Sequence, residues 1–327
     1  MARYAVLGAT SWGLTLTHLL SRGGHDVVVL VRDETEAAAL RENRGIARLP
    51  ELKVAETVRF EVGSEWEPGR DGIVAAVPAQ SMRESLARLP SRRDVPLLSA
   101  AKGIEHGTLL RMSQVALELG WTAEAVSVIS GPNLAHEVAK GLPAAAVVAS
   151  SAGGTATAWQ HALSGGSFRC YRSTDVVGTE LAGALKNIIA IAAGAAAGLN
   201  LGANAIAAIM TRGLAEITRL GVALGADAST FLGLAGIGDL AATCYSPLSR
   251  NHQLGELLAR GLSPADALTK IGETVEGAAT TPVALELARR VAVELPIAEQ
   301  VAAVLEGQAT VADAMAALLS RALRSEV

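Results

Sequence analysis

Residues 174–198 read TDVVGTELAGALKNIIAIAAGAAAG, and the chain changes character on either side of this stretch. Leu181, Leu185 and Ile188 recur at helical spacing, and Thr174 is a suitable N-cap, so the pattern predicts one long helix. Few charges interrupt it, which is typical of a helix buried in a core.

Two polar residues, Lys186 and Asn187, stand in the middle of this apolar helix. A buried lysine loses hydration, so its pKa falls toward neutrality, as a general acid or base requires. Alternatively, Lys186 extends its ammonium group to the surface from a core helix. The rest of the sequence has to decide between these two interpretations.

At the other end of the chain, the segment GATSWG (8–13) separates an apolar strand from a helix expected over residues 14–21, and a valine-rich strand follows at 25–31. A strand, a glycine turn, a helix and a strand within about thirty residues are typical of a dinucleotide-binding unit. Gly8 permits the tight turn and Gly13 the close packing of helix on sheet. Thr10 stands where a glycine usually lets the backbone approach a pyrophosphate.

The residue that ends the second strand helps to select the cofactor. An acidic side chain there binds the ribose 2′-hydroxyl, whereas an arginine accommodates a 2′-phosphate. Arg32 therefore favours NADPH, and Asp33 leaves NADH open, unless Asp33 is only the N-cap of a helix over 34–42.

Short apolar strands and helical segments alternate up to residue 173, and only helical patterns follow it. We therefore expect an α/β fold, with a Rossmann-type doubly wound sheet in residues 1–173 and an all-α domain in residues 174–327. The expected strands are 2–7, 25–31, 57–62, 72–77, 95–100, 125–130, 144–149 and 168–172. After 174–198, the expected helices are 204–224, 250–260, 263–271, 280–291, 297–306 and 310–322, with a turn-rich passage at 233–249 and with Ser263-Pro264 and Thr281-Pro282 as helix starts.

Five strands are followed by residues suited to ligand binding. These are Gly8, Arg32, Pro78, Lys102 and Gly131. In open α/β sheets, ligands lie outside the carboxyl ends of the strands, so we expect these residues to line one binding edge.

The second half carries two further polar turns. Residues 236–239 read GIGD and present Asp239, with Thr243 four residues later. Residues 246–251 read SPLSRN, and Ser249 is a good N-cap for a helix that begins at Arg250. The free N–H groups of that helix start, with Arg250 and Asn251, form a candidate anion site. The alternatives are that Ser249 only caps the helix and that Arg250 only forms a surface ion pair.

Composition excludes several classes of protein. The net charge of −4 provides no basic surface for nucleic acid. Two cysteines, Cys170 and Cys244, lie too far apart in sequence for a secreted disulfide framework, so we expect a cytoplasmic protein. The six histidines show no metal-ligand spacing. Residues 188–210 lack charge, but three glycines interrupt them, so we expect a buried helix–turn–helix and no membrane insertion.

In these motifs and others, the sequence resembles the bacterial-type NAD(P)-dependent glycerol-3-phosphate dehydrogenases. The matching segments follow one another in order over nearly the whole chain, which makes the resemblance highly specific. They are GATSWG (8–13), AKGIE (101–105), SGPNLAHEVAKGLP (130–143), GALKNIIAIA (183–192), TRGLAE (211–216), LAGIGDL (234–240), SPLSRN (246–251) and VEG (275–277).

The resemblance implies a role for each matching residue. Lys186 is the proton donor and acceptor, and Lys102 contacts both substrate and cofactor. It assigns Gly131, Asp239, Ser249, Arg250 and Asn251 to the substrate, and Ser11, Trp12, Arg32, Ala135, Arg250 and Glu276 to the cofactor. Asn133 stands where the family usually has serine, and it keeps the ability to hydrogen-bond the substrate. Ala203 replaces a usually acidic residue, and Thr274 replaces a common valine.

The implied reaction is the reversible reduction of dihydroxyacetone phosphate to sn-glycerol 3-phosphate, which feeds glycerophospholipid synthesis. We expect Lys186 to supply the proton, Asn187 and Lys102 to orient and polarise the substrate, and Asp239 to hold the Lys186 ammonium. Gly8, Gly13 and Pro78 complete the expected cofactor site, and Thr243 the substrate site. We expect a homodimer. The alternatives are a hydroxyacid or ketopantoate reductase with the same two-domain plan, and a nucleotide-binding module without catalysis.

Overall fold

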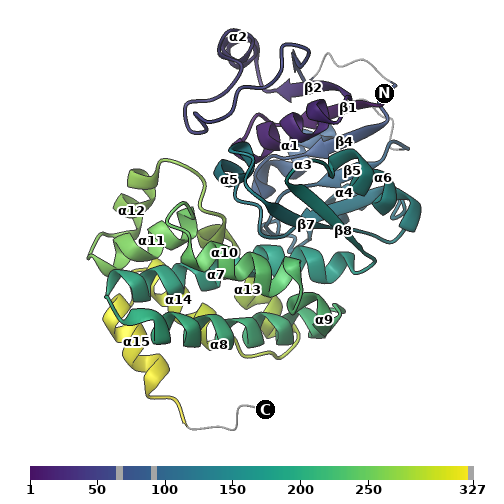
Figure 1. Ribbon diagram of the computed structural model, residues 1–327. Helices are drawn as coiled ribbons and strands as arrows, with labels where there is room; N and C mark the ends of the chain where they lie inside the picture. The colour runs from purple at the N-terminus through teal and green to yellow at the C-terminus, as the bar shows by residue number, and fades with distance from the viewer. Residues whose placement is uncertain (64–68, 90–93, 323–327) are drawn as a thin grey trace.

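The computed structural model describes residues 1–63, 69–89 and 94–322, which form a sheet-containing half and a helical half (Figure 1). In the described residues the sheet has eight strands in the order β3-β2-β1-β4-β5-β6-β7-β8. The strands are β1 (Arg3–Leu7), β2 (Asp26–Val31), β3 (Arg59–Val62), β4 (Gly72–Ala75), β5 (Leu97–Ser99), β6 (Val126–Ser130), β7 (Ala144–Ser150) and β8 (Phe168–Ser173).

The strands from β3 to β6 are mutually parallel, and β7 is antiparallel to β6 and parallel to β8. Hydrophobic side chains cover both faces of the sheet. One face packs against α1 (Ser11–Arg22), α2 (Glu34–Asn43), α5 (Ala135–Ala139) and α6 (Gly153–Leu163). The other packs against the short helix η1 (Ala79–Ser81), α3 (Met82–Ala87) and α4 (Met112–Glu118). The predicted Rossmann-type doubly wound sheet is therefore confirmed.

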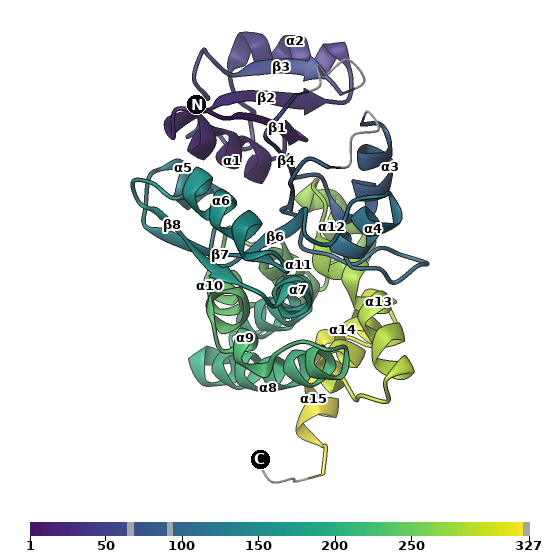
Figure 2. The ribbon, with the colours of Figure 1, turned by 90° about the vertical axis from the view of Figure 1, so that its right-hand side faces the viewer.

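Among the described residues after β8, every regular element is a helix, as predicted. Helix α7 (Val176–Gly198) runs through the middle of this half, and the other helices surround it (Figure 2). They are α8 (Gly202–Ala223), α9 (Ala228–Phe231), the π-helical turn η2 (Leu234–Gly238), α10 (Asp239–Tyr245), α11 (Arg250–Ala259), α12 (Pro264–Ile271), α13 (Glu276–Arg290), α14 (Pro296–Leu305) and α15 (Val311–Leu319).

Helix α7 is long and apolar enough to span a membrane, but 89% of its most apolar window is buried inside the protein. The uncharged run at 188–210 is broken between α7 and α8, which confirms the predicted helix–turn–helix. The N-cap of α7 is Asp175 rather than the predicted Thr174. The Asp175 carboxylate accepts from the backbone N–H of Gly178 at 2.8 Å and from Thr230 Oγ1 at 2.6 Å, so it joins α7 to α9.

Glycines allow α7 and α11 to pack unusually closely. A Cβ atom added at Gly194 of α7 would lie 2.0 Å from the carbonyl oxygen of His252. One added at Gly255 of α11 would lie 2.0 Å from the carbonyl oxygen of Ile191. Only glycine is compatible with these contacts. The packing brings the start of α11 close to the polar middle of α7.

Three further local predictions were wrong. Helix α1 begins at Ser11 rather than at residue 14, because Thr10 caps it. The passage 233–249 is largely helical, since η2 and α10 occupy residues 234–245. Pro282 does not begin a helix but lies inside α13, whose N-cap is Val275, a residue whose side chain makes no capping hydrogen bond. The hydroxyl of Thr281 donates to the carbonyl oxygen of Gly277 at 2.7 Å, within the turn that Pro282 interrupts.

Candidate active site

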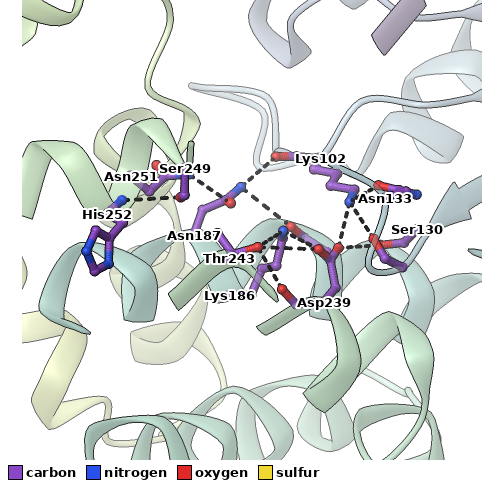
Figure 3. A network of polar contacts seen from close by, with 12 residues as sticks. Lys102, Ser130, Asn133, Lys186, Asn187, Asp239, Thr243, Ser249, Asn251 and His252 are labelled. Atoms are coloured by element: carbon purple, nitrogen blue, oxygen red, sulfur yellow. Dashed lines mark hydrogen bonds and ion pairs between the residues drawn. The ribbon is translucent and has the colours of Figure 1, made fainter. Parts of the chain in front are cut away.

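The centre of the candidate site is the carboxylate of Asp239, which binds two ammonium groups (Figure 3). Lys186 Nζ lies 2.5 Å from Asp239 Oδ1, and Lys102 Nζ lies 2.6 Å from Oδ2. The Asp239 and Lys186 side chains are only 3% and 6% exposed. The Lys186 ammonium is thus buried and paired with Asp239, and the alternative in which it reaches the surface is wrong.

The elements that meet here come from both halves of the protein. Lys186 lies on α7, whereas Asp239 begins α10 immediately after the π-helical turn η2. Lys102 follows β5, at the carboxyl end of the parallel strands. The turn depends on Gly236, because a Cβ atom there would lie 2.0 Å from the carbonyl oxygen of Phe231. The GIGD motif therefore builds a helix start that presents its aspartate to both lysines.

Thr243 completes the coordination of the Lys186 ammonium. Its Oγ1 accepts from Lys186 Nζ at 2.5 Å and donates to the backbone carbonyl of Asp239 at 2.6 Å. An ammonium group has three N–H donors. Within the described residues two of them are engaged by Asp239 and Thr243, which leaves one for a substrate oxygen.

Burial lowers the pKa of Lys186 to about 8, with Asp239 opposing the shift and the ammonium of Lys102 adding to it. Burial alone would raise the pKa of Asp239, but Lys102 and Lys186 hold it below its usual value. The carboxylate therefore stays ionised while Lys186 titrates near physiological pH. This balance, which the sequence leaves open, gives Lys186 the properties of a general acid and base.

Lys102 also contacts the loop after β6. Its ammonium donates to Asn133 Oδ1 at 3.0 Å and to the carbonyl oxygen of Gly131 at 3.2 Å. Gly131 has φ +142°, and a Cβ atom there would lie 2.8 Å from the carbonyl oxygen of Ala145. Ser130, which the sequence analysis did not select, donates to Asp239 Oδ2 at 3.3 Å.

A chain of amide contacts links α7 to the start of α11 (Figure 3). Asn187 Oδ1 accepts from Asn251 Nδ2 at 2.9 Å, and Asn187 Nδ2 lies 3.4 Å from the carbonyl oxygen of Lys102. Asn251 Oδ1 in turn accepts from the backbone N–H of Gly277 at 2.9 Å. Asn187 and Asn251 therefore fix the helices and the Lys102 segment relative to one another.

Ser249 is the N-cap of α11, as predicted, and its Oγ accepts from the backbone N–H of His252 at 3.3 Å. Arg250 is half-exposed and forms an ion pair with Glu273 at 3.3 Å. The first N–H groups of a helix have no intrahelical partners, so this start, with the Arg250 guanidinium beside it, is suited to an anion.

The glycine loop at the end of β1 fits a dinucleotide. Gly8 has φ +100°, and a Cβ atom at Gly13 would lie 2.2 Å from the carbonyl oxygen of Gly8, so both glycines are required. Thr10 Oγ1 accepts from the backbone N–H of Gly13 at 3.0 Å and donates to the carbonyl oxygen of Ala76 at 2.8 Å. Thr10 thereby braces the loop and caps α1, whose start offers N–H groups to a pyrophosphate.

Two buried polar atoms beside these loops also fit a ligand. Within residues 1–63, 69–89 and 94–322, Trp12 Nε1 and Asn133 Nδ2 have no hydrogen-bond partner. Buried donors of this kind are rare unless a ligand or water satisfies them. Trp12 belongs to α1 and Asn133 to the loop that Lys102 contacts, so the residues present fit a bound nicotinamide dinucleotide.

The other predicted cofactor residues lie on neighbouring elements. Pro78 precedes η1, and Glu276 at the start of α13 accepts from the backbone N–H of Ala79 at 3.2 Å. Burial raises the pKa of Glu276, and the Ala79 N–H opposes the shift. Ala135 begins α5, which packs against α1.

The predicted reader of a 2′-phosphate, Arg32, points largely into solvent. Its side chain is 79% exposed and forms an ion pair with Glu36 at 3.2 Å, while Asp33 is the N-cap of α2. A second arginine, which the sequence analysis missed, lies beside the glycine loop: Arg48 Nη2 is 3.4 Å from the carbonyl oxygen of Ala9. No motif surrounds Arg48, so only the folded loop reveals it.

Comparison with known proteins identifies the family of the chain. Residues 3–156 match the family model of the NAD-dependent glycerol-3-phosphate dehydrogenase N-terminus, and residues 175–316 match that of its C-terminus. The chain is 44% identical to a glycerol-3-phosphate dehydrogenase [NAD(P)+] of Rhodopseudomonas palustris, with 98% of each chain covered. It is also 44% identical to one of Nocardia farcinica over the whole of both chains.

Solved structures separate this family from reductases that share only its fold. A glycerol-3-phosphate dehydrogenase from Coxiella burnetii superposes with a TM-score of 0.92 at 34% identity, covering 98% of this chain and 99% of the other. A 2-dehydropantoate 2-reductase from Methylococcus capsulatus reaches a TM-score of 0.58 at 15% identity, over 98% and 99% of the two chains, which shows a shared fold alone. This chain belongs to the NAD-dependent glycerol-3-phosphate dehydrogenase family.

Proposed function

We propose that this protein reversibly reduces dihydroxyacetone phosphate to sn-glycerol 3-phosphate with NAD(P)H. The observation that carries the proposal is the buried Lys186 ammonium, held 2.5 Å from Asp239 and 2.5 Å from Thr243, with Lys102 on the same carboxylate. This arrangement suits a ketone reduction because the reacting oxygen gains negative charge and needs both a proton and a positive field.

A nicotinamide dinucleotide held in this site would supply the hydride for the reduction. Lys186 directs its remaining N–H at the developing alkoxide and transfers that proton, while Asp239 and Thr243 hold the nitrogen in place. Lys102 provides a second positive charge on the same side. In the reverse direction, neutral Lys186 accepts the proton of the alcohol, which its pKa of about 8 permits.

The substrate phosphate would bind at the start of α11, where Ser249 orders the first turn. Arg250 adds charge, and Asn251 ties the turn to Asn187 and thus to the proton-transfer site. Gly131 and Asn133 would line the other side of the substrate. An anion anchored at a helix start gains from the free N–H groups and the helix dipole.

The cofactor would lie along the edge of the sheet. Its pyrophosphate would bind at Gly8, Ser11, Trp12 and Gly13. The other residues that would contact the cofactor are Arg32, Pro78, Lys102, Ala135, Arg250 and Glu276. We infer a preference for NADPH because Arg32 follows β2, the strand beside β1, and Arg48 contacts Ala9 of the glycine loop.

We further propose a domain division at residues 173 and 174, a cytoplasmic location without membrane insertion, and a homodimer. Both cysteines are free and buried, which suits a reducing compartment. The large exposed apolar side chains of the helical half include Leu232 at 73% and Tyr245 at 56%, and a second copy would cover such surface. Sedimentation of the purified protein tests the dimer.

The direct test of function is NADPH oxidation in the presence of dihydroxyacetone phosphate, repeated with NADH and with 2-dehydropantoate as substrate. We expect turnover with the triose phosphate and none with 2-dehydropantoate. Cofactor binding without any turnover would instead favour a nucleotide-binding module.

A further inference from the structure

A buried carboxylate on α7, that of Glu180, is outside the site described so far. Its side chain is 6% exposed. Its Oε1 accepts from the backbone N–H of Ser113 at 2.8 Å, and its Oε2 accepts from Ser113 Oγ and Arg111 Nη1, both at 2.6 Å. Ser113 lies in the first turn of α4, so a negative charge from the helical half meets the positive end of a helix of the sheet half.

The chain between β5 and α4, residues 100–111, is the segment that carries Lys102. It folds back on itself through a bridge between Ile104 and Arg111. Glu180 binds the end of this segment, and Asn187 binds its beginning through the carbonyl oxygen of Lys102. The segment is therefore attached to α7 at two points.

Both attachment points lie on the side of α7 that faces the Lys102 segment. Glu180 and Asn187 are seven residues apart, or about two helical turns, so their side chains share one face. Gly183 lies between them, and a Cβ atom there would be 2.5 Å from Ser130 Oγ and 3.6 Å from Lys102 Cγ. The absence of a side chain at Gly183 lets the Lys102 segment pack directly on the helix.

We propose that Glu180 is a positioning residue that clamps the Lys102 segment to α7 and so sets the spacing of Lys102 and Lys186 on Asp239. The inference rests on the proposed function. Glu180 contacts neither lysine; it acts through the segment 100–111 on one side and through the rigid helix α7 on the other. The same clamp joins the sheet half of the protein to the helical half.

The clamp has a measurable electrostatic consequence. The groups that face Lys186 are Asp239, Thr243, Cys244 and the ammonium of Lys102. Lys102 lowers the pKa of Lys186 directly, and it also shares the Asp239 carboxylate. If the segment moves away, Lys186 keeps Asp239 to itself, and its pKa rises.

The experiment compares Glu180→Gln with a matched control, Glu216→Gln. Glu216 on α8 is also buried and also binds a helix start, since both its oxygens accept from the backbone N–H of Ile297 in α14, at 2.8 and 3.1 Å. It does not touch the Lys102 segment. For both variants we would measure kcat and KM for dihydroxyacetone phosphate against pH, thermal stability, and hydrogen exchange of residues 100–113.

We expect both variants to lose stability, but only Glu180→Gln to lose roughly 10-fold or more in kcat/KM, because misplaced reacting groups are costly. Only in Glu180→Gln should the pH at which reduction falls move above about 8, and only there should residues 100–113 exchange faster. Ser113→Ala, which removes one donor to Glu180 and leaves the others, should shift both readouts the same way by less.

The proposal is overturned if Glu180→Gln loses stability as Glu216→Gln does, with an unchanged pH profile and unchanged exchange of residues 100–113. If Glu180→Gln does not fold, Ser113→Ala decides: unchanged readouts in that variant would reject the clamp. A wild-type protein that is inactive with dihydroxyacetone phosphate would refute the proposed function, whereas the exchange data would still test the clamp itself.

Discussion

The glycine loop at the edge of the sheet and the Lys186–Asp239–Lys102 cluster are both candidate binding regions, but they are built in different ways. One continuous unit, β1-α1-β2, supplies most of the first region. The second joins side chains from α7, α10 and the segment after β5. Asp239 lies 53 residues after Lys186 and 137 residues after Lys102 in the sequence. Local backbone geometry makes the first region, whereas tertiary packing makes the second.

The ion pairs of the two regions differ accordingly. Arg32 and Glu36 lie 3.2 Å apart with the arginine 79% exposed, and exposed pairs of this kind contribute about 0–1 kcal/mol. Lys186 and Asp239 lie 2.5 Å apart, and both are buried. The two pairs thus differ both in distance and in access to water, and the attraction between two charges strengthens where water is excluded.

The largest effect is expected from Lys186→Ala. Loss of the proton donor should reduce turnover by about 100- to 10,000-fold, the usual range for general acid–base catalysis. Cofactor affinity should remain nearly unchanged, because the glycine loop is built independently. Stopped-flow turnover and a fluorescence titration with NADPH measure the two quantities, and near-normal turnover would remove Lys186 from the mechanism.

The next largest effect concerns the buried carboxylate. Asp239→Asn leaves the Lys186 ammonium without its charge partner, so the free energy of unfolding should fall by about 3–5 kcal/mol at pH 7. Because burial and Lys102 both lower the pKa of Lys186, it should fall below about 8 once Asp239 no longer opposes them. Urea unfolding measures the first change; an unaltered midpoint would mean that the pair is not buried in solution.

Gly13→Ala tests the first region. The new Cβ atom would lie 2.2 Å from the carbonyl oxygen of Gly8, so the loop has to move, at a cost of about 1–3 kcal/mol. NADPH binding should weaken about 10-fold or more. Gly153→Ala at the start of α6 is the control, since no described atom beyond its chain neighbours and its own helix backbone lies within 4 Å of its added Cβ. Equal losses in both variants would contradict the assignment.

The smallest effect is expected from the exposed arginines. Arg32→Ala should weaken NADPH more than NADH, by a few-fold, since an exposed charge contact contributes about 1 kcal/mol or less. Arg48→Ala should do the same if its guanidinium serves the same phosphate. Isothermal titration with both cofactors measures the ratio; an equal loss for both would show that neither arginine reads the 2′-phosphate.

Local sequence patterns predicted the first region well. The glycine spacing, the valine-rich second strand and Asp33 as an N-cap are all properties of a few adjacent residues, and the structure confirms each. The residue types alone do not show that α1 begins at Ser11, because they do not show that Thr10 is its N-cap. The Thr10 hydroxyl bonds Gly13 and Ala76, which a pattern of residue types does not reveal.

The second region was only partly predictable. Lys186 and Asn187 stand out because polar residues are unusual in an apolar helix, and Asp239 stands out in a glycine turn. The sequence does not show that Asp239 binds Lys102 as well as Lys186, that Asn251 binds Asn187, or that Glu180 reaches Ser113. These contacts depend on how closely the helices pack. Glycines such as Gly194 allow that close packing, but the sequence does not show which helix lies against them.

The pH dependence of the two reaction directions tests the central claim most directly. Reduction requires the protonated Lys186 and should fall as pH rises through about 8, whereas oxidation of glycerol 3-phosphate requires the neutral amine and should rise through the same pH. The account predicts opposite slopes in kcat/KM that cross over near one common pKa. Parallel slopes, or profiles that stay flat between pH 7 and 9 in both directions, would contradict proton transfer by Lys186.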